Sequence, residues 1–278
     1  MSGYLDCGRF RLTLQRPLVM GVVNVTPDSF SDGAQHFRTA EAIAHARRLV
    51  DEGADILDVG GESTRPGAQA VPVDEELQRV VPVVEALRDC GVPVSVDTCK
   101  PAVMAAVLQA GADMINDIMG FQAPGATEAV ADAACAVCVM HMRGEPRTMQ
   151  DAPVYDDVVG EVGGYLADRA AALRGRGVAP TRIVLDPGFG FGKTVQHNYT
   201  LLARLRELKT GDYPLLVGMS RKSMIGAVTG RTVDRRLGGS IAAALAGAAR
   251  GAHILRVHDV ADTVDALKVW AMVEGVRA

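Results

Sequence analysis

The run Leu185–Thr194, LDPGFGFGKT, places three glycines and a lysine directly after an apolar segment. A glycine-rich turn that ends in Gly-Lys-Thr is typical of loops that bind nucleotide phosphates, and this motif needs a glycine five residues before Gly192. The sequence has Pro187 there, which has no N–H to donate and a fixed φ. The dinucleotide-binding pattern also fails, because Lys193 stands where its third glycine belongs. The glycines therefore do not form a nucleotide-binding loop. Asp186, just before them, becomes the candidate functional residue of this run.

Three polar residues each end an apolar segment: Asp97, Asn116 and Asp186. A buried carboxylate costs free energy unless it is paired or receives hydrogen bonds. A trio of this kind suits a flat heterocycle that offers N–H donors and ring acceptors. Each residue could instead cap the helix that follows it. One such cap would be ordinary, whereas three at equivalent positions favour a binding role.

Cationic side chains follow several of the same apolar segments. In proteins built as a (β/α)₈ barrel, arginine and lysine in the loops after the last strands commonly form a pocket for phosphate. A single arginine there would more often be solvated, but Arg256 and His258 alternate along one segment and so share one face of a strand. Asn24, which ends the first segment, is a candidate oxygen ligand for Mg²⁺ beside phosphate oxygens. The candidate anion-binding residues are Arg65, Arg221, Lys222, Arg256 and His258.

Eight short apolar segments alternate with stretches of helical periodicity. Their nearly continuous Val, Ile and Leu content is typical of strands covered on both faces. Stretches such as 39–54 and 73–91 carry acids early, an apolar stripe and a glycine near the end, as helices do. This alternation predicts an α/β fold, either a (β/α)₈ TIM barrel or an open doubly wound sheet. The predicted strands are 18–25, 55–61, 92–98, 113–118, 136–142, 182–188, 214–220 and 253–259.

The position of the polar residues favours the barrel. They collect at the carboxyl ends of the strands, and in a barrel those ends meet at one rim, where active sites lie. An open sheet would spread them along a line. Two long connections at this rim, Asn24–Phe37 and Gly60–Pro72, are predicted to be lids or binding loops. Residues 4–14 are predicted to form a small hairpin at the other end, and residues 1–278 are expected to form a single domain.

Composition excludes several classes of protein. Of the 278 residues 48% are hydrophobic, enough for a large core, and a net charge of −4 gives no attraction to nucleic acid or an anionic membrane. The start of the chain lacks a secretory signal, and the longest uncharged apolar run, Leu237–Ala249, is too short to span a bilayer. A cytoplasmic protein is therefore expected. The five cysteines are scattered, and Cys135 and Cys138, which lack the second pair of a zinc site, are expected to be buried thiols.

Eight motifs extend in order over residues 20–260. They are MGVVNVTPDSFSDGA from Met20, DVGGESTRPGA from Asp58, SVDTCKPAV from Ser95, INDIMG from Ile115, VMHMRGEPRTMQ from Val139, LDPGFGFGKTVQHN from Leu185, LLVGMSRKSMIG from Leu215 and RVHDV from Arg256. Together they resemble the dihydropteroate synthases, the folate-pathway family that sulfonamides inhibit. Any one motif could arise by chance, but all of them in register are highly specific.

The resemblance implies an enzyme that uses Mg²⁺ to join 4-aminobenzoate to (7,8-dihydropterin-6-yl)methyl diphosphate, giving 7,8-dihydropteroate and diphosphate. It implies a pterin held by Asp97, Asn116, Met140, Asp186, Phe191 and Lys222. It implies a diphosphate held by Asn24, Arg65, Arg256 and His258, with Asn24 near the metal. It places 4-aminobenzoate against Phe30, Thr64, Pro66 and Ser220. A homodimer and sulfonamide inhibitors are implied as well.

The groups available favour a dissociative substitution, with the catalytic roles given to Asp97, Lys222 and Arg256. An electron-rich dihydropterin can delocalise positive charge on its exocyclic carbon once diphosphate leaves, while cationic groups and Mg²⁺ stabilise the departing charge. Asp97 would offset the carbocation, and we find no Ser/His/Asp set that would supply a nucleophile. Cys99 and Met119 depart from residues frequent in the family and lie beside binding residues, where they would affect affinity.

Two other functions fit parts of this pattern. A barrel that transfers a methyl group from a folate or pterin to a corrinoid protein would share the acidic and amide pterin readers, but would not need the diphosphate-binding residues. A pterin-binding module without activity would be expected to lack one or more of Asn24, Arg65, Asp97 and Lys222, all of which are present. Release of pyrophosphate only when both substrates are supplied would distinguish a synthase from either.

Overall fold

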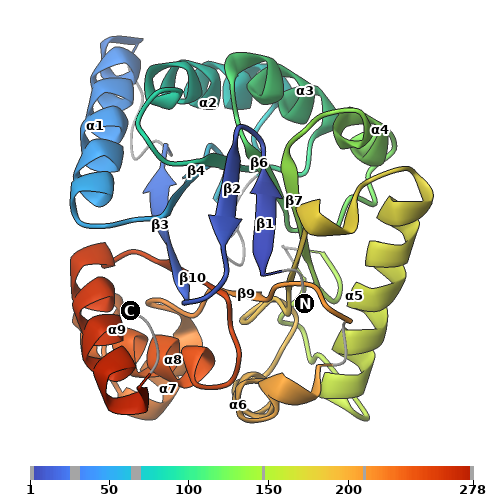
Figure 1. Ribbon diagram of the computed structural model, residues 1–278, viewed down its shortest axis with the longest axis vertical. Helices are drawn as coiled ribbons and strands as arrows, with labels where there is room; N and C mark the ends of the chain where they lie inside the picture. Colours follow the sequence, from blue (N-terminus) through green and yellow to red (C-terminus); the bar gives the residue numbers. More distant parts are fainter. Residues whose placement is uncertain (1–2, 26–31, 64–69, 146–147, 209–210, 276–278) are drawn as a thin grey trace.

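Eight parallel strands of the described chain form one sheet that curls into a barrel, with helices packed around it (Figure 1). The strands run in the order β8-β7-β6-β5-β4-β3-β10-β9. A bridge between Leu185 of β8 and Leu215, just before β9, joins the two ends of the sheet. The predicted (β/α)₈ TIM barrel is therefore confirmed. The computed structural model describes residues 3–25, 32–63, 70–145, 148–208 and 211–275, with the backbone alone for 32–38.

The barrel strands and the helices alternate along the chain. The strands are β3 (Leu18–Asn24), β4 (Ile56–Gly60), β5 (Val94–Asp97), β6 (Met114–Asp117), β7 (Ala136–Met140), β8 (Ile183–Asp186), β9 (Leu216–Val217) and β10 (Ile254–Val257). The helices are α1 (Asp32–Asp51), α2 (Val73–Leu87), α3 (Pro101–Ala110), α4 (Ala126–Ala131), α5 (Val158–Gly175), α6 (Val195–Ala203), α7 (Ser223–Thr229), α8 (Leu237–Ala248) and α9 (Val260–Glu274). Three short 3₁₀ turns are η1 (Pro180–Arg182), η2 (Leu205–Glu207) and η3 (Val233–Arg235).

The wall of the barrel is apolar on both faces. In β3, Val19 and Val23 belong to the large cluster between strands and helices, whereas Leu18 and Met20 belong to a second cluster inside the barrel. Successive side chains of a strand point to opposite faces, so one apolar run supplies both clusters. This explains the continuous rather than alternating hydrophobicity of the strand segments.

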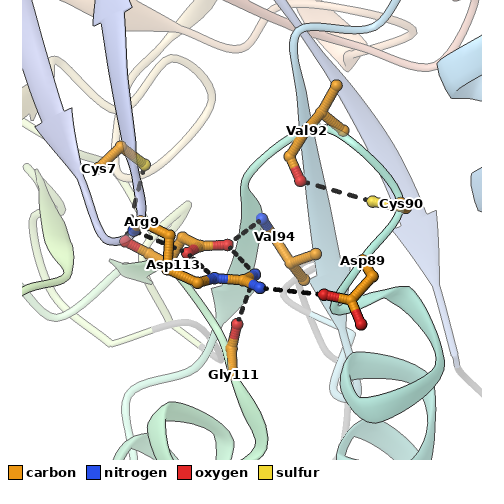
Figure 2. A network of polar contacts seen from close by, with 8 residues as sticks. All are labelled: Cys7, Arg9, Asp89, Cys90, Val92, Val94, Gly111 and Asp113. Carbon is orange, nitrogen blue, oxygen red and sulfur yellow. Dashed lines mark hydrogen bonds and ion pairs between the residues drawn. The ribbon is translucent and has the colours of Figure 1, made fainter.

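A hairpin of β1 (Tyr4–Cys7) and β2 (Phe10–Thr13) lies across the end of the barrel at which the strands begin (Figure 1). Leu5 and Cys7 are fully buried in the inner cluster. Arg9, in the turn, fixes the hairpin through Asp113: its backbone N–H and Nε donate to Oδ1 at 3.2 and 2.9 Å, and Nη2 donates to Oδ2 at 2.9 Å (Figure 2). The predicted hairpin is confirmed, and it closes the end opposite to the polar rim.

Replacing Arg9 with alanine is expected to lower the free energy of unfolding by about 2 kcal/mol. Asp113 would stay buried, and its described partners would be two backbone N–H groups, that of residue 9 at 3.2 Å and that of Val94 at 3.1 Å. Urea denaturation measures the loss, and turnover should not change. Arg11→Ala is the matched control, because its ion pair with Asp6 lies at the surface of the same hairpin and is expected to contribute little to stability. Equal losses of unfolding free energy in the two variants would contradict the stabilising role of the contact between Arg9 and Asp113.

Two boundaries differ from the sequence prediction. Helix α1 begins at Asp32, so the first long connection is shorter than Asn24–Phe37; the segment opens with an acid, which is favourable at a helix start, and contains no proline. The predicted strand 214–220 is reduced to β9, because Pro214 lacks an N–H and the chain turns at Arg221, whose φ is +59°.

Cys135 and Cys138 are buried free thiols, as expected. No helix within the described residues is long and apolar enough to cross a membrane.

Candidate active site

The carboxyl ends of the strands carry a polar layer at the mouth of the barrel. Asp97 of β5 pairs in register with Asn116 of β6, and Met140 of β7 pairs with Asp186 of β8. These residues continue the row of side chains that faces inward: Asn116, for example, is two residues beyond Met114 of the inner apolar cluster. Because side chains two residues apart point the same way, the polar layer lies directly above that cluster.

Arg256 joins two carboxylates in this layer. Its Nε donates to Asp58 Oδ2 at 2.6 Å and its Nη2 to Asp97 Oδ2 at 3.1 Å. Asp58 is fully buried and also accepts the Ser95 hydroxyl at 2.6 Å and the Asn116 amide at 3.2 Å. The sequence left Asp58 without a role, although an acid inside an otherwise apolar strand was the available signal. It is the residue around which the other groups are arranged.

The side-chain oxygen of Asn116 is the exception to this pairing. Asn116 Oδ1 is buried and has no hydrogen-bond partner among the described residues. Asp58 accepts from the amide nitrogen of the same side chain, which fixes the amide and leaves Oδ1 as a free acceptor. Buried acceptors are nearly always satisfied, so this atom marks a position where a ligand is expected to donate a hydrogen bond.

Burial raises the pKa of two acids in the layer, Asp97 and Asp186. The pKa of Asp97 is raised to about 7, mainly by burial; the charge of Arg256 acts against this rise and that of Asp58 adds to it. Burial also raises the pKa of Asp186, against the charge of Lys222 and a hydrogen bond from the Gly188 N–H at 2.7 Å. Ionised carboxylates here are costly without a ligand and would be stabilised by one that donates N–H groups.

Lys222 reaches the mouth from the loop after β9. Burial lowers the pKa of its ammonium group to about 8, although the charges of Asp186 and Asp97 favour the charged form. Its Nζ donates to the carbonyl of Phe189 and lies 4.8 Å from the centre of the Phe191 ring. The structure thus brings this lysine together with the loop that follows Asp186.

An apolar surface borders the same space. Met140 and Phe191 are buried in a small cluster of their own, and Cys99 and Met119 pack against it. Burial raises the pKa of the Cys99 thiol to about 12, which keeps it neutral. Both departures from the family pattern therefore lie next to residues expected to contact the pterin.

Of the remaining expected residues, Ser220 and His258 are in contact. Ser220 Oγ accepts the His258 backbone N–H at 3.2 Å and lies 3.0 Å from His258 Nδ1. Arg221 is instead paired with Asp259, to which its Nε donates at 3.1 Å, so the structure does not bring it to the other cations. Asn24 ends β3 with an exposed side chain. Four expected residues lie outside the described part of the chain: Phe30, Thr64, Arg65 and Pro66.

A metal ion at the mouth would find single ligands rather than a cluster of them among the residues that the structure describes. Among the described residues no group of three or more His, Cys, Asp or Glu side chains could hold a metal. Asn24 would offer one amide oxygen. This fits Mg²⁺ that is coordinated mainly by phosphate oxygens and water, as this ion often is, rather than by a cage of protein ligands.

Known proteins of one kind match this chain. The family described as pterin binding enzyme matches residues 20–258. The dihydropteroate synthase of Escherichia coli K12 is 54% identical over 259 residues, which cover 93% of this chain and 92% of that protein. The crystal structure of Burkholderia cenocepacia dihydropteroate synthase complexed with 7,8-dihydropteroate is similar with a TM-score of 0.90 and 56% identity, covering 98% of this chain and 97% of that one.

Two further solved structures are similar over the whole fold. Xanthomonas albilineans dihydropteroate synthase with 4-aminobenzoic acid has a TM-score of 0.92 and 54% identity, and each chain is covered completely. Yersinia pestis dihydropteroate synthase in a sulfonamide drug complex has a TM-score of 0.93 and 48% identity, covering 98% of this chain and all of that one.

Proposed function

Since the chain belongs to the dihydropteroate synthases, a family of pterin-binding enzymes, we propose that its reaction takes place at the polar mouth of the barrel. The enzyme condenses 4-aminobenzoate with (7,8-dihydropterin-6-yl)methyl diphosphate and releases 7,8-dihydropteroate and diphosphate. The observation that supports this location best is the buried and unpartnered Asn116 Oδ1. It lies in the same layer as Asp97, which pairs with Asn116 in register.

The pterin is assigned to the acids and the amide of the layer. Its ring N–H and amino groups would donate to Asn116 Oδ1 and to the carboxylate of Asp186, and Lys222 would donate to a ring acceptor. Met140 and Phe191 would pack beside the flat ring. Asp58 would contribute to pterin binding indirectly, because it accepts hydrogen bonds that orient the Asn116 amide and the Arg256 guanidinium. The ligand thereby satisfies polar groups that are costly to bury alone.

The chemical step breaks the bond between the exocyclic carbon and the diphosphate oxygen, and the oxygen keeps the electron pair. The carbon then bonds to the 4-aminobenzoate nitrogen, which releases a proton. Asp97, ionised in the mouth, would offset the positive charge on the pterin, and Arg256, His258 and Arg65 would bind the leaving diphosphate. A heavy-atom isotope effect at the exocyclic carbon that indicates tight, associative bonding would contradict this order.

Mg²⁺ would accompany the diphosphate, with Asn24 as its protein ligand. When bound, the ion neutralises charge that develops on the leaving group. Asn24 is suited to this because its side chain is exposed at the end of β3 rather than hydrogen-bonded into the inner layer. Arg256 differs, because two of its nitrogens are already engaged by Asp58 and Asp97. Its charge toward the diphosphate is thus shared with these carboxylates.

The 4-aminobenzoate is assigned to the side of the mouth that holds Ser220, together with Phe30, Thr64 and Pro66. Xanthomonas albilineans dihydropteroate synthase has been solved with 4-aminobenzoic acid and the Yersinia pestis enzyme in a sulfonamide drug complex. By analogy, sulfonamides would bind and inhibit this enzyme.

The chain is further proposed to act as a single domain in the cytoplasm and as a homodimer. One face of α9 exposes Val269, Met272 and Val273, whose side chains are 67%, 84% and 78% exposed. Three apolar side chains in one turn and a half of helix support an interface there. Sedimentation analysis of the wild type and of Met272→Glu tests this, and a wild-type monomer at micromolar concentration would contradict it.

Pyrophosphate release tests the activity. Release is expected when the pterin diphosphate, 4-aminobenzoate and Mg²⁺ are all present, and is expected to be absent with the pterin diphosphate alone. Methyl transfer to a corrinoid protein with no pyrophosphate release would instead support the related methyltransferase function. Binding of the pterin without either reaction would identify a pterin-binding module.

The pH dependence of kcat/KM for the pterin diphosphate is expected to be bell-shaped, with limbs near pH 7 and pH 8. Asp97 acts as the anion, so activity is present above its pKa of about 7 and falls as the pH drops through that value. Lys222 acts as the cation, so activity falls as the pH rises through its pKa of about 8. Initial rates between pH 5 and pH 10 measure both limbs. A constant kcat/KM down to pH 5 would exclude an ionised Asp97 as a requirement.

A further inference from the structure

Lys193, the lysine of the phosphate-loop look-alike, is enclosed in the protein. It is only 2% exposed. Its Nζ lies 2.9 Å from His141 Nδ1 and donates to the carbonyls of Gly188 and Phe191 at 2.9 and 3.0 Å. The three ammonium hydrogens are thereby matched by three acceptors, and the His141 carbonyl is a fourth at 3.5 Å. The proposed reaction makes no use of this buried cation.

The glycine turn is shaped around the ammonium group. Gly188 has a φ of +68°, and a Cβ there would lie 1.9 Å from the His141 carbonyl oxygen. Gly192 has a φ of +59°, and a Cβ there would lie 2.4 Å from the Arg143 carbonyl oxygen. No other residue type tolerates both the conformation and the contact. A phosphate loop turns N–H groups toward an anion, whereas this loop turns carbonyls toward a cation.

The same turn also holds the lysine of the pterin site. Lys222 Nζ donates to the carbonyl of Phe189 and lies over the ring of Phe191. Lys193 therefore bonds to residues on either side of the carbonyl that positions Lys222. Loss of the Lys193 ammonium group would leave the Gly188 and Phe191 carbonyls and the His141 ring nitrogen buried without this donor, and the turn would have to rearrange.

We propose that Lys193 is a positioning residue of the pterin site: its ammonium group, held by His141, Gly188 and Phe191, fixes the turn that presents Phe189 and Phe191 to Lys222. The inference rests on the proposed function of this mouth. It assigns a role to the Gly-Lys-Thr run that phosphate binding does not fill. Lys193 would act on the pterin site in two ways: it holds the turn in place, and its charge acts on Asp186.

The surroundings of Lys193 act on its charge in both directions. Burial lowers the pKa of Lys193 to about 7, Asp186 favours its charged form and Lys222 disfavours it. In return, the charge of Lys193 lowers the pKa of Asp186 against the effect of burial. Burial, together with the charges of Lys193 and Arg143, lowers the pKa of His141 to about 3, so its ring is neutral and can accept from the ammonium group.

Lys193→Met is the direct test, because methionine has nearly the same length and removes the donor. We expect KM for the pterin diphosphate to rise about tenfold or more, the size of one lost charge-assisted hydrogen bond, and KM for 4-aminobenzoate to change less than about twofold. The acid limb of kcat/KM, assigned to Asp97, should stay near pH 7, because Lys193 is not among the groups that shift the pKa of Asp97. Lys268→Met, an exposed lysine on α9, is the matched control and should change neither value.

The outcomes separate the inference from the function. A wild type that releases no pyrophosphate overturns the function, whereas an active wild type with an unchanged pterin KM in Lys193→Met overturns the inference alone. A lowered Tm with both KM values unchanged also overturns it, because the role would then be structural. If Lys193→Met does not fold, His141→Leu decides: it removes one acceptor, and a rise in the pterin KM supports the inference while an unchanged value overturns it.

Discussion

Asp97→Asn is expected to lower kcat by roughly 10²- to 10³-fold, the range for removal of one preorganised electrostatic group from an active site. The asparagine oxygen can still accept the hydrogen bond from Arg256 Nη2, so the fold and the position of Arg256 should persist. What is lost is the negative charge opposite the pterin carbocation. Pyrophosphate release at saturating concentrations of both substrates measures the effect.

The same substitution should not destabilise the protein. The pKa of Asp97 is raised in the folded state, from 3.8 to about 7, so the folded state binds the proton more tightly than the unfolded state. Stability attributable to this group is therefore full at low pH and is lost as the pH rises through about 7. At pH 8 the asparagine variant is expected to have an equal or higher Tm. Asp168→Asn, at an exposed position on α5, is the control. A kcat within threefold of the wild type would remove Asp97 from the mechanism.

Arg256→Ala is expected to reduce both activity and stability. Truncating one partner of a buried charge pair costs about 2–5 kcal/mol in binding, which is roughly a 30- to 5,000-fold loss in kcat/KM. Removal of the guanidinium would also leave Asp58, which is fully buried, and Asp97 without their shared cation, so the free energy of unfolding should fall by about 3–5 kcal/mol. Steady-state kinetics and urea denaturation measure the two losses.

Two further variants give this prediction its controls. Arg256→Lys keeps the charge but cannot reach both carboxylates with the planar fork of a guanidinium, and should give losses between those of wild type and Arg256→Ala. Arg174→Ala, at an exposed position on α5, should change the unfolding free energy by less than about 0.5 kcal/mol. A normal KM for the pterin diphosphate in Arg256→Ala would place the anion elsewhere.

Most of the fold could be predicted from local pattern. The apolar segments and helical stretches gave the (β/α)₈ order because strands buried on both faces and amphipathic helices have distinct periodicities. The hairpin at residues 4–14 was visible through its alternating polarity. The start of α1 at Asp32 was missed because the first turns of that helix lack an apolar stripe in the sequence DGAQHFR.

The candidate site residues were predicted by a rule that is also local. Asn116, Asp186 and Arg256 stand at the ends of strands, and the barrel gathers those ends whatever the loops between them do. Which of these groups touch one another is not local. Arg256 was expected to bind the diphosphate, yet it pairs with Asp58 and Asp97. These residues lie on two other strands, about 200 and 160 residues earlier in the chain.

The sequence by itself determined the order of elements, the residues at the mouth and, by resemblance, the reaction. Only the tertiary structure decided how the charges are shared: that Asp58 organises Asn116 and Arg256, and that Lys193 lies inside the turn rather than at a phosphate. The reason is physical. Periodicity fixes the direction of a side chain, whereas partners, burial and pKa depend on distances between strands that the chain sets only when the barrel closes.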